Sequence, residues 1–135
     1  MVALALLAKA CTAGAASIEC PSEIFPNSIK LEQAPSGWQF YADSPLYLHS
    51  SAPMTGPPEM RAQLIPDAEQ HKAGQWSHTY QLDGPSPYGK WIQCSYGTHD
   101  EMTLSKRIDD NTLTCTVRYR KGAKAGQNNI QINCK

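Results

Sequence analysis

The sequence predicts an all-β protein: a single antiparallel β domain, meander or sandwich-like, stapled by two disulfides. Apolar and polar residues alternate with a period of two along much of the chain, and no segment keeps a helical stripe for three turns. The 135 residues, a length that suits one domain, include 9 glycines and 10 prolines, which favour short strands over long helices. The third observation is the cysteine count, which becomes even once an N-terminal segment is removed.

The N-terminus has the order of a secretory signal. Residues 2–8 are all apolar, and the small residues Ala13-Gly14-Ala15-Ala16 follow, which is the arrangement of an apolar core before a cleavage site. We expect a signal peptide at 1–16 and a β-rich domain at 17–135, and cleavage after Ala15 or after Ala16 fits equally well. An alanine-rich tail is the alternative. The apolar run is far shorter than the roughly 20 residues of a membrane anchor, so we expect a periplasmic or secreted protein without stable membrane insertion.

Export also resolves the odd number of cysteines. The chain has five, and removal of the signal takes away Cys11. Lipidation of Cys11 is an alternative that Lys9 disfavours, because it places a charge beside the apolar run. An even number in an exported chain indicates disulfides and no free thiol. The remaining cysteines are Cys20, Cys94, Cys115 and Cys134. None of their spacings is Cys-x-x-Cys, so neither a zinc site nor a redox pair is expected.

The first half of the chain is the less regular one. Strand candidates are residues 28–33 and 38–42, which flank a turn at 35–37; a short strand containing Leu46 and Leu48, which ends at Pro53; and residues 61–65, either strand or one helical turn, which end at Pro66. Proline has no backbone N–H and so terminates regular pairing. We expect this half to contribute short strands joined by rigid loops.

The second half alternates more clearly. Its strand candidates are residues 75–82, 91–97, 101–108, 112–120 and 129–134. In the clearest of them, Cys115, Val117 and Tyr119 share one face with Leu113, while threonines and arginines occupy the other. Turn-forming residues at 109–111 separate two of the segments. The last 45 residues therefore predict a four-stranded antiparallel meander with one apolar face.

The strand phases bear on the disulfide pairing. Cys94, Cys115 and Cys134 lie on the apolar face of this predicted sheet. With one strand between them, Cys94 and Cys115 would be roughly 9–10 Å apart, which is beyond the reach of a disulfide. Cys115 and Cys134 would lie on adjacent strands. This favours 20–94 with 115–134, and the two other connectivities remain open.

The composition excludes several classes of function. Twelve basic and twelve acidic residues give a net charge of zero, which argues against a partner such as nucleic acid or an anionic membrane. The sequence contains neither a Gly-x-Ser-x-Gly elbow nor a glycine-rich phosphate loop. We therefore expect no cofactor, no metal and no catalytic residue.

One group of residues could still support acid–base chemistry. His99, Asp100 and Glu101 follow one another in a predicted turn, and an imidazole beside carboxylates can transfer protons near neutral pH. Turns also collect such residues for solvation alone, so we assign this group no catalytic role. His78 shares a strand face with Trp76 and Tyr80, which is typical of a packed histidine.

Positive charge concentrates near the C-terminus. The candidate partner-binding residues are Arg118, Arg120, Lys121 and Lys124, with Lys106 and Arg107 on the strand predicted beside them, and the aromatic Tyr88 in a glycine- and proline-rich loop. Such a patch can dock an acidic partner. The alternative is a solvated sheet face and edge, where Lys and Arg discourage aggregation.

Four short motifs follow one another along the chain: Ile18-Glu19-Cys20-Pro21; Ala34-Pro35-Ser36-Gly37-Trp38; Gly56-Pro57-Pro58 with Leu64-Ile65-Pro66-Asp67; and Trp91-Ile92-Gln93-Cys94-Ser95-Tyr96, which leads to Cys115 and Cys134. Together they resemble an uncharacterised family of small exported four-cysteine proteins of Gram-negative bacteria that carries no functional name. The resemblance implies a periplasmic location and the four-cysteine pattern. It implies no activity and transfers no site residue.

These observations favour a small periplasmic, non-catalytic protein-binding module of the inhibitor or immunity type. Its partner would be a toxin, an effector or a cell-wall enzyme. The alternatives are a small periplasmic hydrolase that uses the His-carboxylate group, and an envelope structural component that recruits a strand at a sheet edge.

Overall fold

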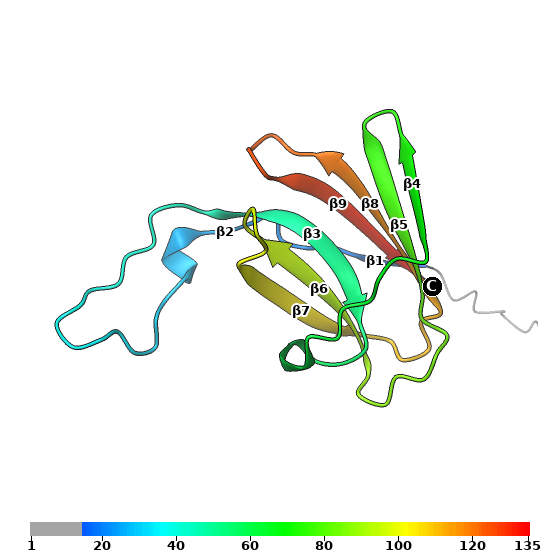
Figure 1. Cartoon of the computed structure of the whole chain (residues 1–135), viewed down its shortest axis with the longest axis horizontal. Helices are drawn as coiled ribbons and strands as arrows, with labels where there is room; N and C mark the ends of the chain where they lie inside the picture. Colours follow the sequence, from blue (N-terminus) through cyan, green and yellow to red (C-terminus); the bar gives the residue numbers. More distant parts are fainter. Residues whose placement is uncertain (1–14) are drawn as a thin grey trace, which may run out of the picture.

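Two antiparallel sheets form the part of the chain that the computed structural model describes, residues 15–135 (Figure 1). The five-stranded sheet has the order β1-β9-β8-β5-β4, and the four-stranded sheet has the order β2-β3-β6-β7. The strands are β1 (Ala16–Ile18), β2 (Glu23–Ile24), β3 (Leu46–Met54), β4 (Ala68–Lys72), β5 (Gln75–Gln81), β6 (Lys90–Tyr96), β7 (Met102–Ile108), β8 (Thr114–Lys121) and β9 (Asn128–Cys134). Two 3-10 turns, η1 (Pro26–Ser28) and η2 (Pro58–Met60), are the helical elements of this range. The predicted all-β, antiparallel class is confirmed.

The predicted signal peptide lies almost wholly outside the described residues. Cys11 lies outside them too, so the structure does not address its lipidation. Within residues 15–135, no helix is long and apolar enough to cross a membrane.

The core lies between the two sheets and follows the predicted alternation. On β8, Cys115, Val117 and Tyr119 are at most 5% exposed, whereas Arg118 and Arg120 are exposed. The other core side chains come from both sheets: Leu48, Ala52, Tyr80, Leu82, Ile92, Cys94, Tyr96, Ile132 and Cys134. All five alternating segments of the second half are strands. β5, β6, β8 and β9 contribute buried side chains to the core, whereas β7 has no fully buried residue.

The predicted four-stranded meander is wrong, because its strands belong to different sheets. β7 pairs with β6, whereas β8 pairs with β5 and β9. The predicted turn at 109–111 does form, and beyond it the Leu113 C=O accepts a hydrogen bond from the Leu82 N–H, while the Leu113 N–H donates to Lys135. The chain thus crosses to the five-stranded sheet, and Leu113 is 57% exposed. Alternation identifies a buried face but not the neighbouring strand.

The predicted disulfide pairing is confirmed. The argument that Cys115 and Cys134 lie on adjacent strands is correct, but the argument that excluded a bond between Cys94 and Cys115 is not. Cys115 and Cys134 are directly opposite on β8 and β9, and their Cα atoms are 4.1 Å apart. Cys20 bonds Cys94 of β6 with a Cα separation of 5.9 Å. Since Cys94 lies in the other sheet, the expected spacing across one intervening strand does not exist.

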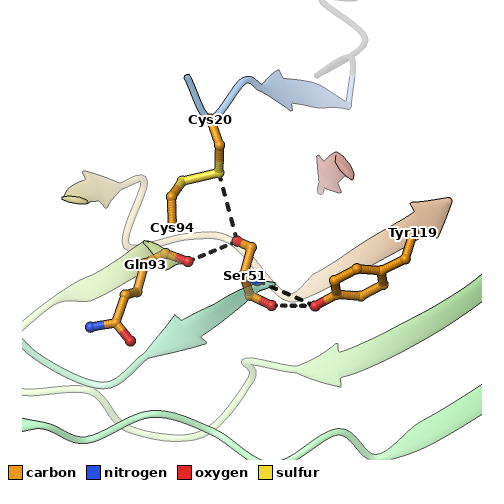
Figure 2. The surroundings of a disulfide bond; sticks show 5 residues. All are labelled: Cys20, Ser51, Gln93, Cys94 and Tyr119. Carbon is orange, nitrogen blue, oxygen red and sulfur yellow. Dashed lines mark hydrogen bonds between the residues drawn. A yellow bond between two sulfur atoms is a disulfide. The ribbon is translucent and has the colours of Figure 1, made fainter. Parts of the chain in front are cut away.

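A tyrosine joins β3 to the other sheet at the part of the β3 edge that the short strand β2 does not reach (Figure 2). The Tyr119 hydroxyl donates to the Ser51 C=O at 2.7 Å and accepts from the Ser51 N–H at 3.3 Å. The Ser51 hydroxyl donates to the Gln93 C=O at 2.8 Å, next to the Cys20–Cys94 disulfide. The phenol therefore satisfies a backbone donor and acceptor that a neighbouring strand would otherwise bind.

The irregular first half contains fewer strands than predicted. Residues 28–33 and 38–42 form no strand, and every residue from 31 to 41 is exposed. Prolines at 26, 35 and 45 cannot donate to a ladder, and these segments bury no continuous face.

The strand at Leu46 is longer than predicted and continues through Pro53. The Pro53 C=O accepts from the Leu64 N–H at 2.9 Å. Because the N and O of one residue point to the same edge of a strand, the proline nitrogen faces away from β6 and costs no bond with it. Residues 61–65 are neither strand nor helical turn, although Gln63 bridges Met54.

The sequence gives no indication of β4. All five of its residues are exposed, so no alternation marks it.

Candidate partner-binding surface

The outer face of the five-stranded sheet carries Arg118 and Arg120. Residues paired across neighbouring strands point to the same face, so the register identifies the side chains beside them. The first row is Gln70, Ser77, Arg118 and Gln131, and the second is Lys72, Gln75, Arg120 and Asn129. We call these two rows the basic face.

The charge of the basic face is positive and uncompensated. Its only charged members are Lys72, Arg118 and Arg120, and its other side chains are Ser, Asn and Gln. Within residues 15–135, neither arginine forms an ion pair. Glu69, the acidic residue of β4, lies on the opposite face of the sheet, where its Oε1 is 3.7 Å from His78 Nε2. The next row, through Thr116, is uncharged as well: Ala68, Thr79, Thr116 and Asn133.

Lys121 and Lys124 extend this positive charge at one end of the sheet. Lys121 ends β8, and Lys124 lies in the turn before β9, whose backbone is closed by a 2.8 Å bond from the Gly122 N–H to the Gln127 C=O. Both lysines are exposed. A depression of about 330 Å³ lies on the basic face beside the β4–β5 hairpin. Its lining includes Gln70, Lys72, Trp76, Ser77 and Arg118.

Tyr88 is not part of this surface. It is 62% exposed in the loop that follows β5, and its C=O accepts from Trp91 Nε1 at 3.3 Å. The pairing of Gln75 with Arg120 and of Gln81 with Thr114 puts this loop at the end of the sheet opposite to Lys121. Figure 1 shows the same separation.

Lys106 and Arg107 are likewise not beside Arg118, because β7 belongs to the other sheet. The Arg107 guanidinium is moreover compensated by Asp110, with Nη2 to Oδ2 at 3.1 Å. The prediction that Lys106 and Arg107 lie beside Arg118 is therefore wrong, because β7 and β8 do not pair with each other.

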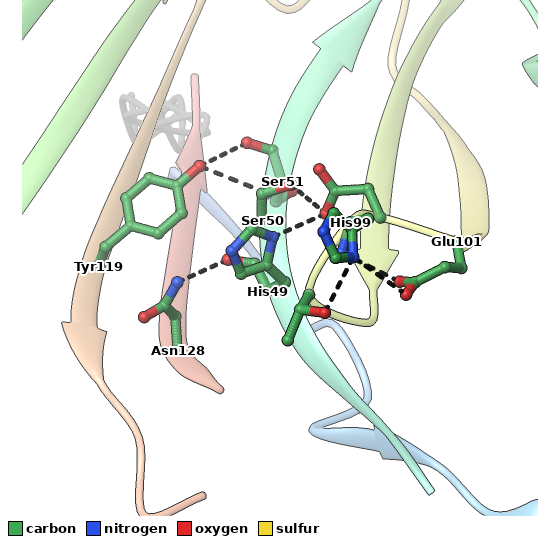
Figure 3. Close-up of polar contacts among 9 residues, drawn as sticks. His49, Ser50, Ser51, His99, Glu101, Tyr119 and Asn128 are labelled. Carbon is green, nitrogen blue, oxygen red and sulfur yellow. Dashed lines mark hydrogen bonds and ion pairs between the residues drawn. The ribbon is translucent and has the colours of Figure 1, made fainter. Parts of the chain in front are cut away.

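The His-carboxylate group lies in the turn between β6 and β7 and is divided between two partners (Figure 3). Asp100 Oδ1 lies 2.9 Å from His49 Nδ1 and accepts from the Ser50 hydroxyl at 3.1 Å. In a catalytic triad the imidazole lies between the hydroxyl and the carboxylate, whereas here the carboxylate lies between the other two. These contacts connect the β6–β7 turn to β3.

Glu101 closes the same turn on itself. Its Oε2 accepts from the His99 N–H at 3.1 Å, and its Oε1 lies 3.6 Å from His99 Nδ1. Hydrogen bonds from its own N–H and from that of His99 lower the pKa of Glu101. The His99 ring is 86% exposed, so the predicted cluster forms a solvated turn. Across the described part of the chain, no three His, Cys, Asp or Glu side chains converge as metal ligands.

Sequence reasoning missed a second exposed surface. The predicted strands at 28–33 and 38–42 belong instead to a loop that exposes Trp38 by 76% and Tyr41 by 82%. Three aromatic residues lie between Pro35 and Pro45 without a regular alternation of polar and apolar residues. This is the sequence feature that could have indicated an exposed aromatic surface.

One comparison with known proteins gives a match, and it is to a protein family. Residues 42–135, more than two thirds of the chain, match the family model described as type VI secretion system Tli immunity protein. Neither the curated proteins nor the solved structures give a match. The match supplies the functional description that the resemblance in the sequence lacked, and it agrees with the expected non-catalytic, immunity-type module that binds a toxin effector. The chain belongs to the type VI secretion system Tli immunity protein family.

Proposed function

We propose that this protein neutralises a type VI effector toxin in the periplasm by binding it through the basic face. The observation that carries the proposal is the pair Arg118 and Arg120, central in two rows of outward-facing residues that contain no acidic side chain. Arginine is enriched at protein interfaces and pairs carboxylates in a bidentate manner. The effector surface that fits is acidic and polar.

The sheet suits this role because it is already rigid. The Cys115–Cys134 disulfide joins β8 and β9, the strands that carry Arg118, Arg120 and half of the basic face, three positions along β8 from Arg118. A pre-organised surface loses little conformational entropy when it binds. The short Ser, Asn and Gln neighbours leave both guanidinium groups accessible.

The periplasmic location rests on the predicted signal. Ala16 begins β1 and pairs with Cys134, so cleavage after Ala15 keeps the whole strand, whereas cleavage after Ala16 removes one of its three residues. Retention of the whole strand favours cleavage after Ala15, and so a mature chain of residues 16–135, over the division into 1–16 and 17–135 expected from the sequence. The intact mass of protein recovered from periplasm tests this, and a full-length chain in the cytoplasm would contradict it.

Charge reversal tests the binding surface. The probe is a purified, catalytically inactivated type VI effector of the bacterium from which this chain comes. Arg118→Glu with Arg120→Glu should raise the Kd about 100-fold, as expected when attraction in a well-packed interface becomes repulsion. Thermal stability should change little, since exposed charges contribute only about 0–1 kcal/mol.

A control with the same change in net charge separates local contact from general attraction. Lys106→Glu with Lys135→Glu alters two exposed lysines outside the basic face and should leave the Kd within about threefold of wild type. Equal losses in both double variants would mean long-range attraction instead of docking at the basic face. An unchanged Kd in the Arg118 and Arg120 variant would place the interface elsewhere.

A further inference from the structure

We infer that residues 25–45, the aromatic loop, dock the same effector through an apolar contact centred on Trp38 and Tyr41. The inference rests on the proposed function, because it takes the effector as the occupant. It adds a second surface of different chemistry from the basic face.

The aromatic loop is closed at its base and open at its tip. β2 and β3 pair antiparallel at that base, with Ile24 opposite Leu46, so the two ends of the loop are adjacent. The Cys20–Cys94 disulfide holds the segment that enters it. In Figure 1 the loop extends away from both sheets. Surface loops held by a rigid scaffold disproportionately carry binding residues.

Large apolar side chains on this loop face solvent. Trp38 is 76% exposed, Tyr41 82% and Phe25 59%. A turn presents Trp38, since its N–H donates to the Pro35 C=O at 3.0 Å and Gly37 takes a φ of 82°. The two limbs also flank a depression of about 470 Å³. Its lining includes Phe25, Ile29, Phe40 and Tyr41. Exposed apolar patches of this kind mark interaction sites.

The size of the patch matches part of an interface with another protein. A buried aromatic side chain covers about 150–250 Å², so the exposed parts of these three offer roughly 300–500 Å². A standard interface uses about 800 Å² of each partner, and obligate homodimers use considerably more. The patch therefore suits the apolar centre of a heterologous interface better than that of an obligate dimer.

Charge argues against a membrane as the occupant. The aromatic loop contains one lysine, Lys30, and two carboxylates, Glu32 and Asp43. Anionic membrane surfaces attract clusters of Lys and Arg, and this loop is slightly acidic. An uncharged apolar pocket on a protein is the surface that it fits.

The position of the family match points to the effector. The match begins at Ala42, so Trp38, Tyr41 and Phe25 precede the part shared with the family. The matched region contains all four strands that carry the basic face, and the aromatic loop is continuous with it at Ala42. Trp and Tyr are the residues most often found at interface hot spots.

The test measures the Kd for the inactivated effector with a Trp38→Ala/Tyr41→Ala double variant. We expect the Kd to rise about 100-fold or more, with an unchanged melting temperature because both side chains are exposed. The matched control is Ile65→Ala with Leu113→Ala, two apolar side chains that are 85% and 57% exposed outside the aromatic loop; it should stay within about threefold of wild type.

The outcomes separate this inference from the proposed function. If the double variant binds as wild type while the Arg118 and Arg120 reversal does not, the aromatic loop is not a docking element and the proposed function stands. If the wild-type chain does not bind the effector, both proposals fail. Sedimentation of the wild type with phosphatidylglycerol–phosphatidylethanolamine vesicles that depends on Trp38, or a dimer in light scattering that depends on Trp38, would overturn the inference in favour of those occupants.

Discussion

Two buried tyrosines with opposite hydrogen-bonding states show how much a single hydroxyl can contribute. The Tyr119 hydroxyl bonds both backbone groups of Ser51, and its ring stacks on Trp76 at 5.2 Å between centroids. The Tyr96 hydroxyl is buried without a hydrogen-bond partner. A buried polar group without a partner costs free energy, whereas a satisfied one stabilises the fold.

The same substitution should therefore have different effects at these positions. Tyr119→Phe leaves the Ser51 N–H and C=O without their partner and should lower the free energy of unfolding by about 1–3 kcal/mol. Tyr96→Phe should be neutral or stabilising by up to about 1 kcal/mol, because it removes an unpaired hydroxyl. Urea unfolding of both variants measures the difference. Equal destabilisation would show that the Tyr119 hydroxyl does not hold β3.

Alkaline pH should destabilise the protein through its buried tyrosines. Burial raises the pKa of Tyr96 to about 12, and burial also raises the pKa values of Tyr80 and Tyr119. Below the unfolded pKa of about 10 the stabilising contribution is complete, and it is lost as the pH rises from about 10 through the folded pKa values. The free energy of unfolding should be flat between pH 8 and 9 and fall between about 10 and 12. A stability that stays constant to pH 12 would contradict the burial of these phenols.

At the scale of the element, β8 separates the core from the candidate interface by alternation alone. Val117 is 0% exposed between the sheets, and its neighbour Thr116 faces outward beside Thr79 and Asn133. One strand therefore supplies both packing and the basic face. A shift of one residue in its register would exchange the two.

Charged substitutions should distinguish these faces. Val117→Asp should prevent folding or cost more than about 4 kcal/mol, because it buries an unpaired charge. Thr116→Asp should cost less than about 1 kcal/mol, since its side chain faces solvent. Thermal melts check both, and similar losses would mean that the strand is covered on both faces.

At the scale of the whole molecule, the two disulfides perform different tasks. Cys20–Cys94 spans 74 positions and joins the N-terminal segment to the four-stranded sheet, whereas Cys115–Cys134 spans 19 and joins two neighbouring strands. In the chain-entropy view, the longer closed loop constrains the unfolded chain more.

Removal of the disulfides one at a time should show this difference. Replacing Cys20 and Cys94 by Ala should cost about 4 kcal/mol, and replacing Cys115 and Cys134 about 3 kcal/mol, by the dependence on loop length. Chemical denaturation of each double variant compares them. A larger loss at Cys115 and Cys134 would mean that native packing around that pair outweighs chain entropy.

The sequence by itself determined the all-β class, the five strands from residue 75 onward and the placement of Cys115 opposite Cys134. Each of these features depends on local information. β5, β6, β8 and β9 bury one face against the core, so polar and apolar residues must alternate along them. Cys115 and Cys134 could be placed opposite each other because their strands are joined by one short turn.

Only the tertiary structure decided which strands are neighbours and which surfaces are free. A period of two marks a buried face but does not specify the sheet, so the crossing after β7 could not be read from residues 101–120. β4 buries nothing and leaves no pattern. The aromatic loop resembles two strands in composition, yet no partner covers it within the described residues. The rows that join Arg118 to Gln70 and Gln131 come from long-range pairing, which brings together residues from three separate parts of the chain.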